Sequence, residues 1–303
     1  MKAVRLHTPG GVDNLVYEDV DTPAPLAGEA LVRVHAAAIT RDELNWPVER
    51  LPAIPSYELS GTVVAIGEGV AEVELGQAVY ALTGFERDGV AAEFAAVPAA
   101  RLTSKPATLS HVESAAVPLP ALSAMQGLFD HGHLEKDQRV LIHGGGGGVG
   151  AYAVQLAHLH GAYVIATASG ERVEAARTLG ADEVIDHTVA DFSTIAPVNL
   201  VFDTVGGDRL AHSLSVLEPG GRLVSVAEEP PPAMCAEHGV EGNFFIVEPD
   251  RNQLEELARL ADQGQLRVLV DRTYSLAEAR RAFERSLDRT GLGKVVLRVI
   301  DGD

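Results

Sequence analysis

Residues 140–150 carry the spacing in this chain that most clearly implies chemistry. Val-Leu-Ile-His is followed by five consecutive glycines and then Val-Gly. Gly145, Gly147 and Gly150 fit a G-x-G-x-x-G spacing, and Gly144, Gly147 and Gly150 fit a G-x-x-G-x-x-G variant. Such glycines permit a tight turn, close backbone approach to a pyrophosphate, and close packing of helix on strand. The following helix N-terminus would offer N–H groups to the phosphates. A flexible glycine linker is the alternative, and the apolar flanks weigh against it.

The segments after these glycines alternate between strand and helix patterns. Short apolar runs at 163–168, 183–186, 199–203 and 222–226 read as strands, and 171–179 reads as a helix closed by Gly180. Alternation at this spacing favours βαβ units and a parallel sheet. We therefore expect an α/β, doubly wound dinucleotide-binding (Rossmann) domain over residues 120–249.

The end of the second strand should select the cofactor. Residues 167–172 read Thr-Ala-Ser-Gly-Glu-Arg, so no carboxylate stands at the strand tip, where an NAD site usually places one. Ser169 and Arg172 could instead hold a 2′-phosphate, because a guanidinium matches phosphate oxygens. We expect NADPH rather than NADH. Glu171 keeps NADH open, and Glu171 and Arg172 could also be ordinary surface residues of a first helical turn.

The length, composition and charge of the chain argue against several classes of protein. The 303 residues suggest two domains, and 46% hydrophobic with 22% charged residues is ordinary for a soluble protein. No run of 18 apolar residues predicts a membrane span, and the first residues read as a strand rather than a signal peptide. Cys235 is the only cysteine, which excludes an internal disulfide and favours a cytoplasmic location. A net charge of 24 − 43 = −19 argues against nucleic acid or anionic membrane partners.

The two ends of the chain have a different pattern. Residues 1–119 contain short β-type runs separated by Gly and Pro, which predict a partly open antiparallel barrel. The closing segment, residues 250–303, reads as a helix at 252–263, a strand at 268–270, a second helix through Phe283, and a strand at 294–299. We expect this last strand to pair back onto the barrel and complete that domain.

Six motifs spread along the chain carry a resemblance to a known family. They are Pro-Ser-Tyr-Glu-Leu-Ser-Gly at 55–61, Ile-Gly-Glu-Gly-Val at 66–70 with Leu-Gly-Gln-Ala-Val-Tyr at 75–80, the glycine turn at 143–150, Gly-Ala-Asp-Glu-Val-Ile-Asp at 180–186, Phe-Phe-Ile-Val at 244–247, and Gly-Lys-Val-Val-Leu at 293–297. Together they resemble the medium-chain dehydrogenase/reductase superfamily, and specifically its zinc-free quinone oxidoreductase branch. The resemblance implies a GroES-like barrel domain beside the Rossmann domain.

The resemblance also implies a mechanism in which zinc plays no part. Thr40 stands where zinc-dependent relatives have a catalytic Cys, and Tyr57 stands where they have a His. Without zinc, reduction of a quinone or an α,β-unsaturated carbonyl fits better than oxidation of an alcohol. Tyr57 could donate a proton and Thr40 could lie near the nicotinamide, although each could also be packed structure, and solvent could supply the proton. Glu43 and Trp46 are expected in the substrate cleft.

By the same resemblance, several Rossmann residues should contact the cofactor. They are Gly145, Gly147, Gly148, Val149, Gly150, Ser123, Ser169, Arg172, His187, Thr204, Val205, Ser225, Ala227, Phe244, Phe245 and Val247. Four histidines could serve as substitute metal ligands, namely His35, His111, His131 and His133, but packed or exposed histidines are the simpler interpretation. We expect a homodimer, as is common among such relatives. An NADPH-binding redox sensor or structural protein with little turnover is the alternative function, and a zinc alcohol dehydrogenase is a weaker third.

Overall fold

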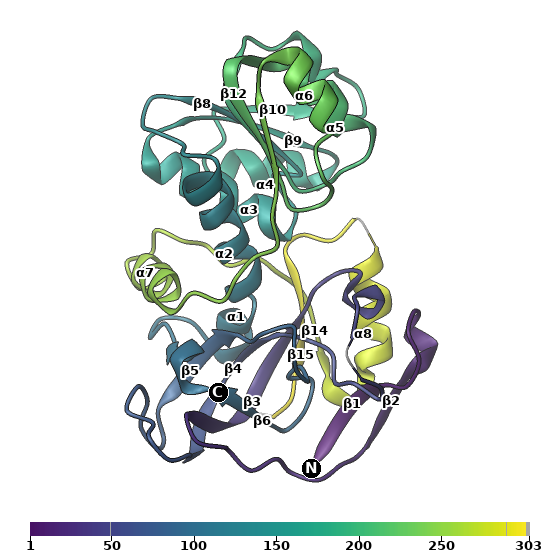
Figure 1. The fold of residues 1–303 in the computed structure, drawn as a ribbon, viewed down its shortest axis with the longest axis vertical. Helices are drawn as coiled ribbons and strands as arrows, with labels where there is room; N and C mark the ends of the chain where they lie inside the picture. The colour runs from purple at the N-terminus through teal and green to yellow at the C-terminus, as the bar shows by residue number, and fades with distance from the viewer. Residues whose placement is uncertain (49, 289, 301–303) are drawn as a thin grey trace. The chain divides into compact units, whose positions relative to one another are not determined.

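The structure is a computed structural model that describes residues 1–48, 50–288 and 290–300. It divides into two compact units, which are described separately (Figure 1). Unit 1 comprises Met1–Leu119 and Pro249–Asp303, and unit 2 comprises Pro120–Glu248. Within the described ranges, no helix is both long and apolar enough to span a membrane.

Unit 2 is built on a six-stranded sheet in which every pairing is parallel. Its strands are β8 (Arg139–His143), β9 (Tyr163–Ala168), β10 (Glu183–Asp186), β11 (Val198–Asp203), β12 (Leu217–Ser225) and β13 (Glu241–Phe244). The spatial order is β10-β9-β8-β11-β12-β13, so the strand order reverses beside β8. Leu141, Ile165, Val201 and Leu223 in the middle strands are fully buried, as expected for a sheet covered on both faces. The predicted doubly wound fold is confirmed.

The helices of unit 2 connect these strands. They are α2 (Pro118–Met125), which starts at the end of unit 1, a π-helical continuation at Gln126–His131, α3 (Gly148–His160), α4 (Glu171–Thr178), α5 (Asp208–His212) and α6 (Pro232–His238). Gly161 ends α3 with a φ of 86°, a conformation that glycine adopts without a Cβ penalty. Residues 150–157 of α3 are all buried, and several of them are small, among them Ala151, Ala153 and Ala157. Small side chains let a buried helix pack closely against its neighbours.

Unit 1 is mostly an antiparallel sheet that curves around its own core. Its strands are β1 (Lys2–Leu6), β2 (Leu15–Asp19), β3 (Glu29–Ile39), β4 (Glu58–Ile66), β5 (Ala78–Leu82), β6 (Phe94–Pro98), β7 (Thr103–Ser104), β14 (Val270–Ser275) and β15 (Lys294–Arg298). The larger sheet runs β14-β15-β3-β4-β5-β7, with β6 also on β3, while β1 and β2 form a separate pair. Alternating residues of β3, such as Val32 and Val34, face the core with no exposed area.

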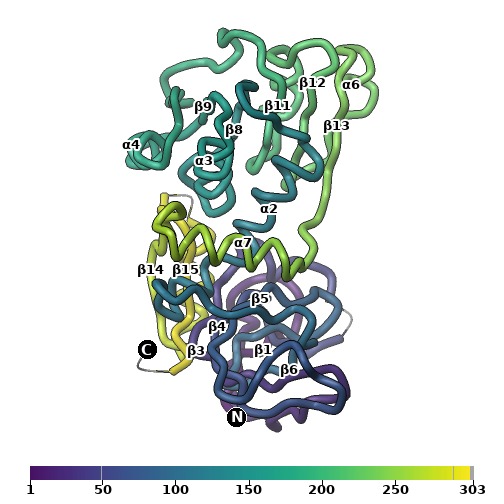
Figure 2. Tube along the Cα trace, turned by 90° about the vertical axis from the view of Figure 1, so that its left-hand side faces the viewer, coloured from purple at the N-terminus to yellow at the C-terminus, as the bar shows by residue number. Residues whose placement is uncertain are grey.

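The return of the chain to unit 1 is confirmed, with one correction. Strand β15 pairs antiparallel with β3, and Figure 2 shows β14 and β15 alongside it. The strand expected at 268–270 is misplaced: β14 starts at Val270, runs to Ser275, and pairs parallel with β15. Its sequence, Val-Asp-Arg-Thr-Tyr-Ser, is polar and half-buried at an edge, so the apolar residues just before it gave a misleading signal.

Three helices complete unit 1: α1 (His111–Ala115), α7 (Arg251–Asp262) and α8 (Ala279–Leu287). Ser110 and Glu113 form a reciprocal capping box at the start of α1. The Asp250 side chain accepts a hydrogen bond from the Gln253 amide and caps α7. Ala279, Ala282 and Phe283 of α8 are buried in the unit's core.

Candidate functional site

The glycine turn of unit 2 has the geometry of a phosphate cradle. Gly144, directly after β8, has a φ of 79°, and a Cβ there would lie 2.8 Å from Thr204 Oγ1. A Cβ on Gly150 would lie 2.1 Å from the Gly144 carbonyl oxygen, so helix α3 packs directly on the turn. Gly147 is the N-cap of α3 and no side chain caps the first-turn amides. Those amides can therefore bind an anion, as the sequence predicted for a pyrophosphate.

A basic and polar group lies where β9 and β10 end. Asp186 of β10 is in register with Ala168 of β9, and the His187 amide donates to the Ala168 carbonyl at 3.1 Å. The Arg172 amide donates to the Ser169 carbonyl at 3.2 Å. A Cβ on Gly146 would lie 2.5 Å from the Arg172 Cβ, so Arg172 borders the glycine turn. Of the three residues predicted to read a 2′-phosphate, Ser169 and His187 thus follow adjoining strand ends, and Arg172 stands in the first turn of α4.

The next strand ends, β11 and β12, are joined by a buried carboxylate. Asp203 has no exposed area; it accepts hydrogen bonds from the Ser225 hydroxyl at 3.0 Å and from the Gly206 amide at 3.0 Å. Burial raises the pKa of Asp203, and these hydrogen bonds oppose the shift. Ser225 Oγ also accepts from the Ala227 amide at 3.1 Å. The predicted Ser225 hydroxyl is therefore occupied within the protein, where it shapes the loop at Ala227.

The remaining predicted cofactor residues differ in exposure. Phe244 ends β13 and is 40% exposed, whereas Phe245 and Val247 are buried, and the Phe245 ring packs on His131 at 4.3 Å between centroids. Ser123, in α2, is also buried. Thr204 donates its hydroxyl to the His143 carbonyl at 2.7 Å, which ties β11 to the start of the turn. Val205 follows it, half-buried.

His143 is a residue of this edge whose contacts the sequence did not reveal. It is fully buried at the end of β8, with Nε2 2.9 Å from Ser213 Oγ and Nδ1 3.1 Å from Thr167 Oγ1. Ser213 already donates to the Arg209 carbonyl, which assigns the Nε2–H tautomer to His143. Burial lowers the pKa of His143 to about 3. A neutral His143 therefore holds the base of the glycine turn at every physiological pH.

Unit 1 contains a second polar cluster, built around a buried lysine. Lys294 starts β15 and lies 2.6 Å from Glu58 Oε1 and 3.0 Å from Thr40 Oγ1. Glu58 has no exposed area, and its other oxygen accepts the Leu119 amide at 2.9 Å. Thr40 is thus held by a buried ion pair. Its hydroxyl, at the position where the resemblance places a metal-binding Cys, is engaged with Lys294 and Glu58.

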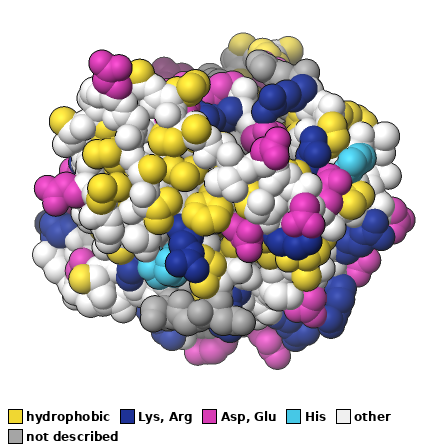
Figure 3. Space-filling model, turned by 90° about the horizontal axis from the view of Figure 1, so that it is seen from below, with side chains coloured by type: hydrophobic (Ala, Val, Ile, Leu, Met, Phe, Trp, Pro, Cys, Tyr) yellow, Lys and Arg dark blue, Asp and Glu magenta, His cyan; other side chains and the backbone are white. Residues whose placement is uncertain are grey.

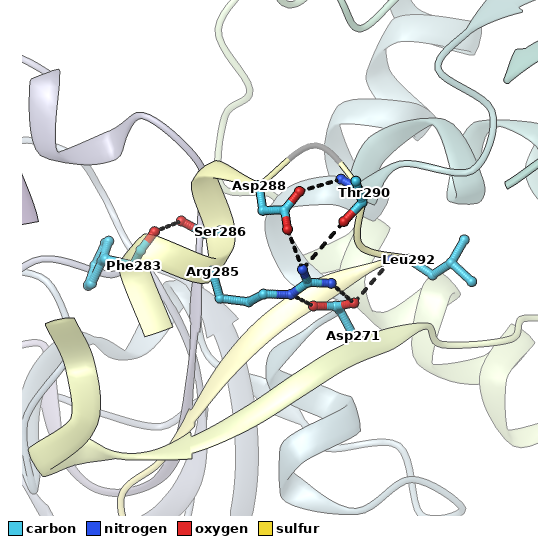
Figure 4. A network of polar contacts seen from close by, with 7 residues as sticks. All are labelled: Asp271, Phe283, Arg285, Ser286, Asp288, Thr290 and Leu292. Carbon is cyan, nitrogen blue, oxygen red and sulfur yellow. Dashed lines mark hydrogen bonds and ion pairs between the residues drawn. The ribbon is translucent and has the colours of Figure 1, made fainter. Parts of the chain in front are cut away.

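A network of ion pairs and hydrogen bonds at the end of α8 holds the segment of chain that precedes Lys294. Arg285 donates to both oxygens of Asp271, at 2.6 and 2.8 Å, and also to Asp288 at 2.7 Å (Figure 4). Asp271 accepts the Leu292 amide at 3.2 Å as well. Because Asp271 lies on β14, this network fastens the turn from α8 to the strand beside β15.

Tyr57 belongs to a cluster of three aromatic rings. The Trp46 ring stacks on Tyr57 with centroids 6.0 Å apart, and Phe85 packs edge-on against both rings at 5.3 and 5.1 Å. Tyr57 is 5% exposed, and burial raises the pKa of its hydroxyl to about 12. The phenol therefore keeps its proton at neutral pH. Phe85 was not predicted, because nothing in the sequence connects it to Tyr57 or Trp46.

Glu43 lies below the surface of unit 1. It begins a short 3-10 turn (Glu43–Asn45) and is 4% exposed. Burial raises the pKa of Glu43 to about 8, although the Lys294 charge pulls the other way.

The candidate histidines are placed in packed or exposed positions. His35 and His111 stack at 4.1 Å, and His111 Nδ1 lies 2.7 Å from Ser60 Oγ. His131 packs on Phe245, and His133 is exposed. Across the described ranges, no three His, Cys, Asp or Glu side chains gather as a metal site would require.

Two protein families match this chain, each over a different range of residues. The alcohol dehydrogenase GroES-like domain family matches residues 26–107, and the zinc-binding dehydrogenase family matches residues 179–297. A probable zinc-binding oxidoreductase of Arthroderma benhamiae is 31% identical over 94% of this chain and 93% of its own. The 2-methylene-furan-3-one reductase of Solanum lycopersicum is 31% identical over 99% of this chain and 79% of its own.

Solved structures agree in fold. The quinone oxidoreductase of Coxiella burnetii is similar with a TM-score of 0.93 and 29% identity, covering 99% of both chains. Similarity at this level extends over the barrel strands, the parallel sheet and the return segment alike. The protein therefore belongs to the medium-chain dehydrogenase/reductase superfamily, alongside its quinone oxidoreductases.

Proposed function

We propose that this protein is an NADPH-dependent reductase that transfers hydride to a quinone or to the activated C=C bond of an α,β-unsaturated carbonyl. The relatives are named as oxidoreductases, and they include a quinone oxidoreductase and a 2-methylene-furan-3-one reductase. The choice of NADPH and of this acceptor class goes beyond that common ground. It rests on the chain's own residues.

The group at the ends of β9 and β10 is the observation that carries the cofactor proposal. Ser169, Arg172 and His187 lie there, and no carboxylate occupies the tip of β9. A guanidinium beside a phosphate-binding turn favours a 2′-phosphate, whereas a bare ribose usually meets an acid. The glycine turn and the first amides of α3 would hold the pyrophosphate. When bound, the cofactor supplies the hydride.

The chain's own residues would do three further things in this reaction. The buried Lys294–Glu58 pair holds the Thr40 hydroxyl in one orientation. The Trp46 and Phe85 rings form an apolar wall around Tyr57, which excludes water. The protonated Tyr57 hydroxyl can donate to the oxygen where negative charge develops as the acceptor is reduced.

The test is cofactor oxidation, followed by nicotinamide absorbance, against a small panel of acceptors. The panel holds a benzoquinone, a linear enone, a linear enal and a simple ketone, each with NADPH and with NADH. Turnover of the quinone or the enones, with the ketone inert, supports the proposal. Tight NADPH binding with no turnover of any acceptor would favour the alternative, an NADPH-binding sensor or structural protein.

We also propose that the protein works in the cytoplasm as a homodimer on small molecules. The net charge of −19 disfavours nucleic acid and anionic membranes as partners. On the face drawn in Figure 3, acidic and basic side chains are interspersed rather than gathered into one basic patch. Light scattering at micromolar concentration tests the assembly, and a single monomer peak would contradict it.

A further inference from the structure

Three polar side chains of unit 1 form a closed triangle of contacts. The Lys294 ammonium lies 2.6 Å from Glu58 Oε1 and 3.0 Å from Thr40 Oγ1. The third side of the triangle, from Thr40 Oγ1 to the same Glu58 oxygen, measures 3.3 Å. Lys294 is 7% exposed and Glu58 has no exposed area, whereas Thr40 is only half-buried. Thr40 is therefore the member of the triangle that a bound molecule can reach most easily.

The pairing of three neighbouring strands places these side chains together. Strand β15 pairs antiparallel with β3, which brings Lys294, at the start of β15, to Thr40, just after β3 ends. Glu58 is the first residue of β4, which pairs with β3 along its other edge. The Lys294 amide also donates to the Leu269 carbonyl at 2.9 Å. Backbone hydrogen bonds therefore set the positions from which all three side chains extend.

The contacts of Thr40 restrict where its hydroxyl proton can point. A lysine ammonium only donates hydrogen bonds, so Lys294 donates to Thr40 Oγ1 and the hydroxyl proton must find another acceptor. Within the triangle that acceptor is Glu58 Oε1, which already accepts from Lys294. The 3.3 Å from Thr40 is longer than the roughly 2.8 Å that is usual between two oxygens in a hydrogen bond. The Thr40 hydroxyl therefore gains a better hydrogen bond when it turns to the oxygen of a bound molecule.

We propose that the Thr40 hydroxyl donates a hydrogen bond to the carbonyl oxygen of the acceptor, and that Lys294 is the positioning residue that keeps Thr40 a donor. This inference rests on the proposed reductase function and names the atom of the substrate that Thr40 binds. Hydride addition leaves negative charge on that oxygen, in an enolate or a quinol anion, so the hydrogen bond strengthens in the transition state. Thr40 keeps its proton throughout, and Glu58 balances the charge of Lys294.

The first test detects this hydrogen bond without turnover. The infrared C=O stretching band of an enone is recorded in its complex with the protein and oxidised NADP⁺, which has no hydride to transfer. A carbonyl that accepts a hydrogen bond absorbs at lower frequency, so the band should shift upward in Thr40→Val, which keeps the side-chain shape and removes the hydroxyl. Thr40→Ser should keep the lower frequency. Thr62→Val, which removes a half-buried hydroxyl from β4, is the matched control and should also keep it. The same frequency in wild type and Thr40→Val would overturn the proposal.

The second test measures the contribution of Thr40 to the rate. Thr40→Val should lower kcat for the enone by about 100-fold, the order of loss when one donor to a developing oxyanion is removed. NADPH affinity should not change, Thr40→Ser should recover most of the rate, and Thr62→Val should match wild type. A wild-type kcat in Thr40→Val would refute the donor role.

A double-mutant cycle tests whether Lys294 acts through Thr40. Lys294→Met alone would leave the buried Glu58 carboxylate unpaired, so it is combined with Glu58→Gln, which removes both charges, and urea unfolding checks that this variant is folded. It should lower kcat, and adding Thr40→Val should lower kcat little further, because residues that act as one unit are not additive. Lys294→Arg, which keeps the charge, should retain more of the rate. Full, multiplicative losses would mean that Lys294 does not act through Thr40.

Failure of this inference can be told apart from failure of the proposed function. If the wild-type protein reduces no acceptor and binds none in the presence of NADP⁺, the reductase proposal fails and the role of Thr40 falls with it. If wild type reduces the enone while Thr40→Val keeps the wild-type kcat and C=O frequency, the reductase proposal stands and Thr40 is only structural.

Discussion

Replacing Glu43 with Gln should stabilise the protein, by an amount that grows with pH. Glu43 has a folded pKa of about 8 against an ordinary value of 4.5. The folded state therefore binds a proton between these two pH values that the unfolded state has lost. Stability from this group is fully present below pH 4.5 and declines as pH rises to about 8. Gln stays neutral in both states, so the variant has no such decline.

The magnitude follows from the size of the shift. Each pH unit between the two pKa values changes the free energy of unfolding by about 1.4 kcal/mol. At pH 7 the difference between variant and wild type should be roughly 3 kcal/mol larger than at pH 4.5, and at pH 8 it should be about 4 kcal/mol larger. The Gln amide lacks partners as the carboxyl does, which adds an offset that is the same at every pH. The slope is therefore the quantity to measure.

Urea unfolding followed by tryptophan fluorescence is a suitable assay. Trp46 is the only tryptophan and lies in unit 1 near Glu43, so the signal reports the unit of interest. Both proteins would be unfolded at intervals from pH 5 to 9. Glu58→Gln is the contrasting variant: it leaves Lys294 without its partner and should destabilise by about 3–5 kcal/mol. Parallel stability curves for Glu43→Gln and wild type would refute the reasoning.

Two further predictions concern residues that hold each unit together. Gly150→Ala should destabilise unit 2 by about 1–3 kcal/mol and abolish NADPH binding, because its Cβ would lie 2.1 Å from the Gly144 oxygen; calorimetry and a binding titration measure both, and normal affinity would contradict it. Asp271→Asn should cost about 1–3 kcal/mol by breaking the two-point contact with Arg285, seen as a lower urea midpoint.

Local signals in the sequence were sufficient to predict much of the secondary structure of unit 2. Apolar runs of strand length and a glycine-rich turn are read over a few residues, so β8 to β12 and the start of α3 were predictable. The sixth strand, Glu241–Phe244, was missed because Glu-Gly-Asn-Phe has no apolar alternation and gains its place by pairing with β12. The strand ends then placed the predicted cofactor residues along one edge.

The polar cluster of unit 1 could not be predicted from the sequence, because its members are far apart in the chain. Thr40 and Lys294 are 254 residues apart in sequence and meet only because β15 pairs with β3. Glu43 was predicted for the substrate cleft from its neighbours in sequence, and its burial depends on strands that lie far along the chain. That neither oxygen of its carboxyl has a hydrogen-bond partner among the described residues can be seen only in three dimensions.

The most direct test of the central claim compares initial rates with NADPH and NADH for one enone. Wild type should prefer NADPH, and Arg172→Ala should lose about 10- to 100-fold of that preference, as expected for one charge-assisted phosphate contact of about 1.5–3 kcal/mol. Arg177→Ala, which removes an exposed arginine of the same helix, should behave as wild type. Equal rates with both cofactors in wild type, or equal losses in Arg172→Ala, would contradict the account.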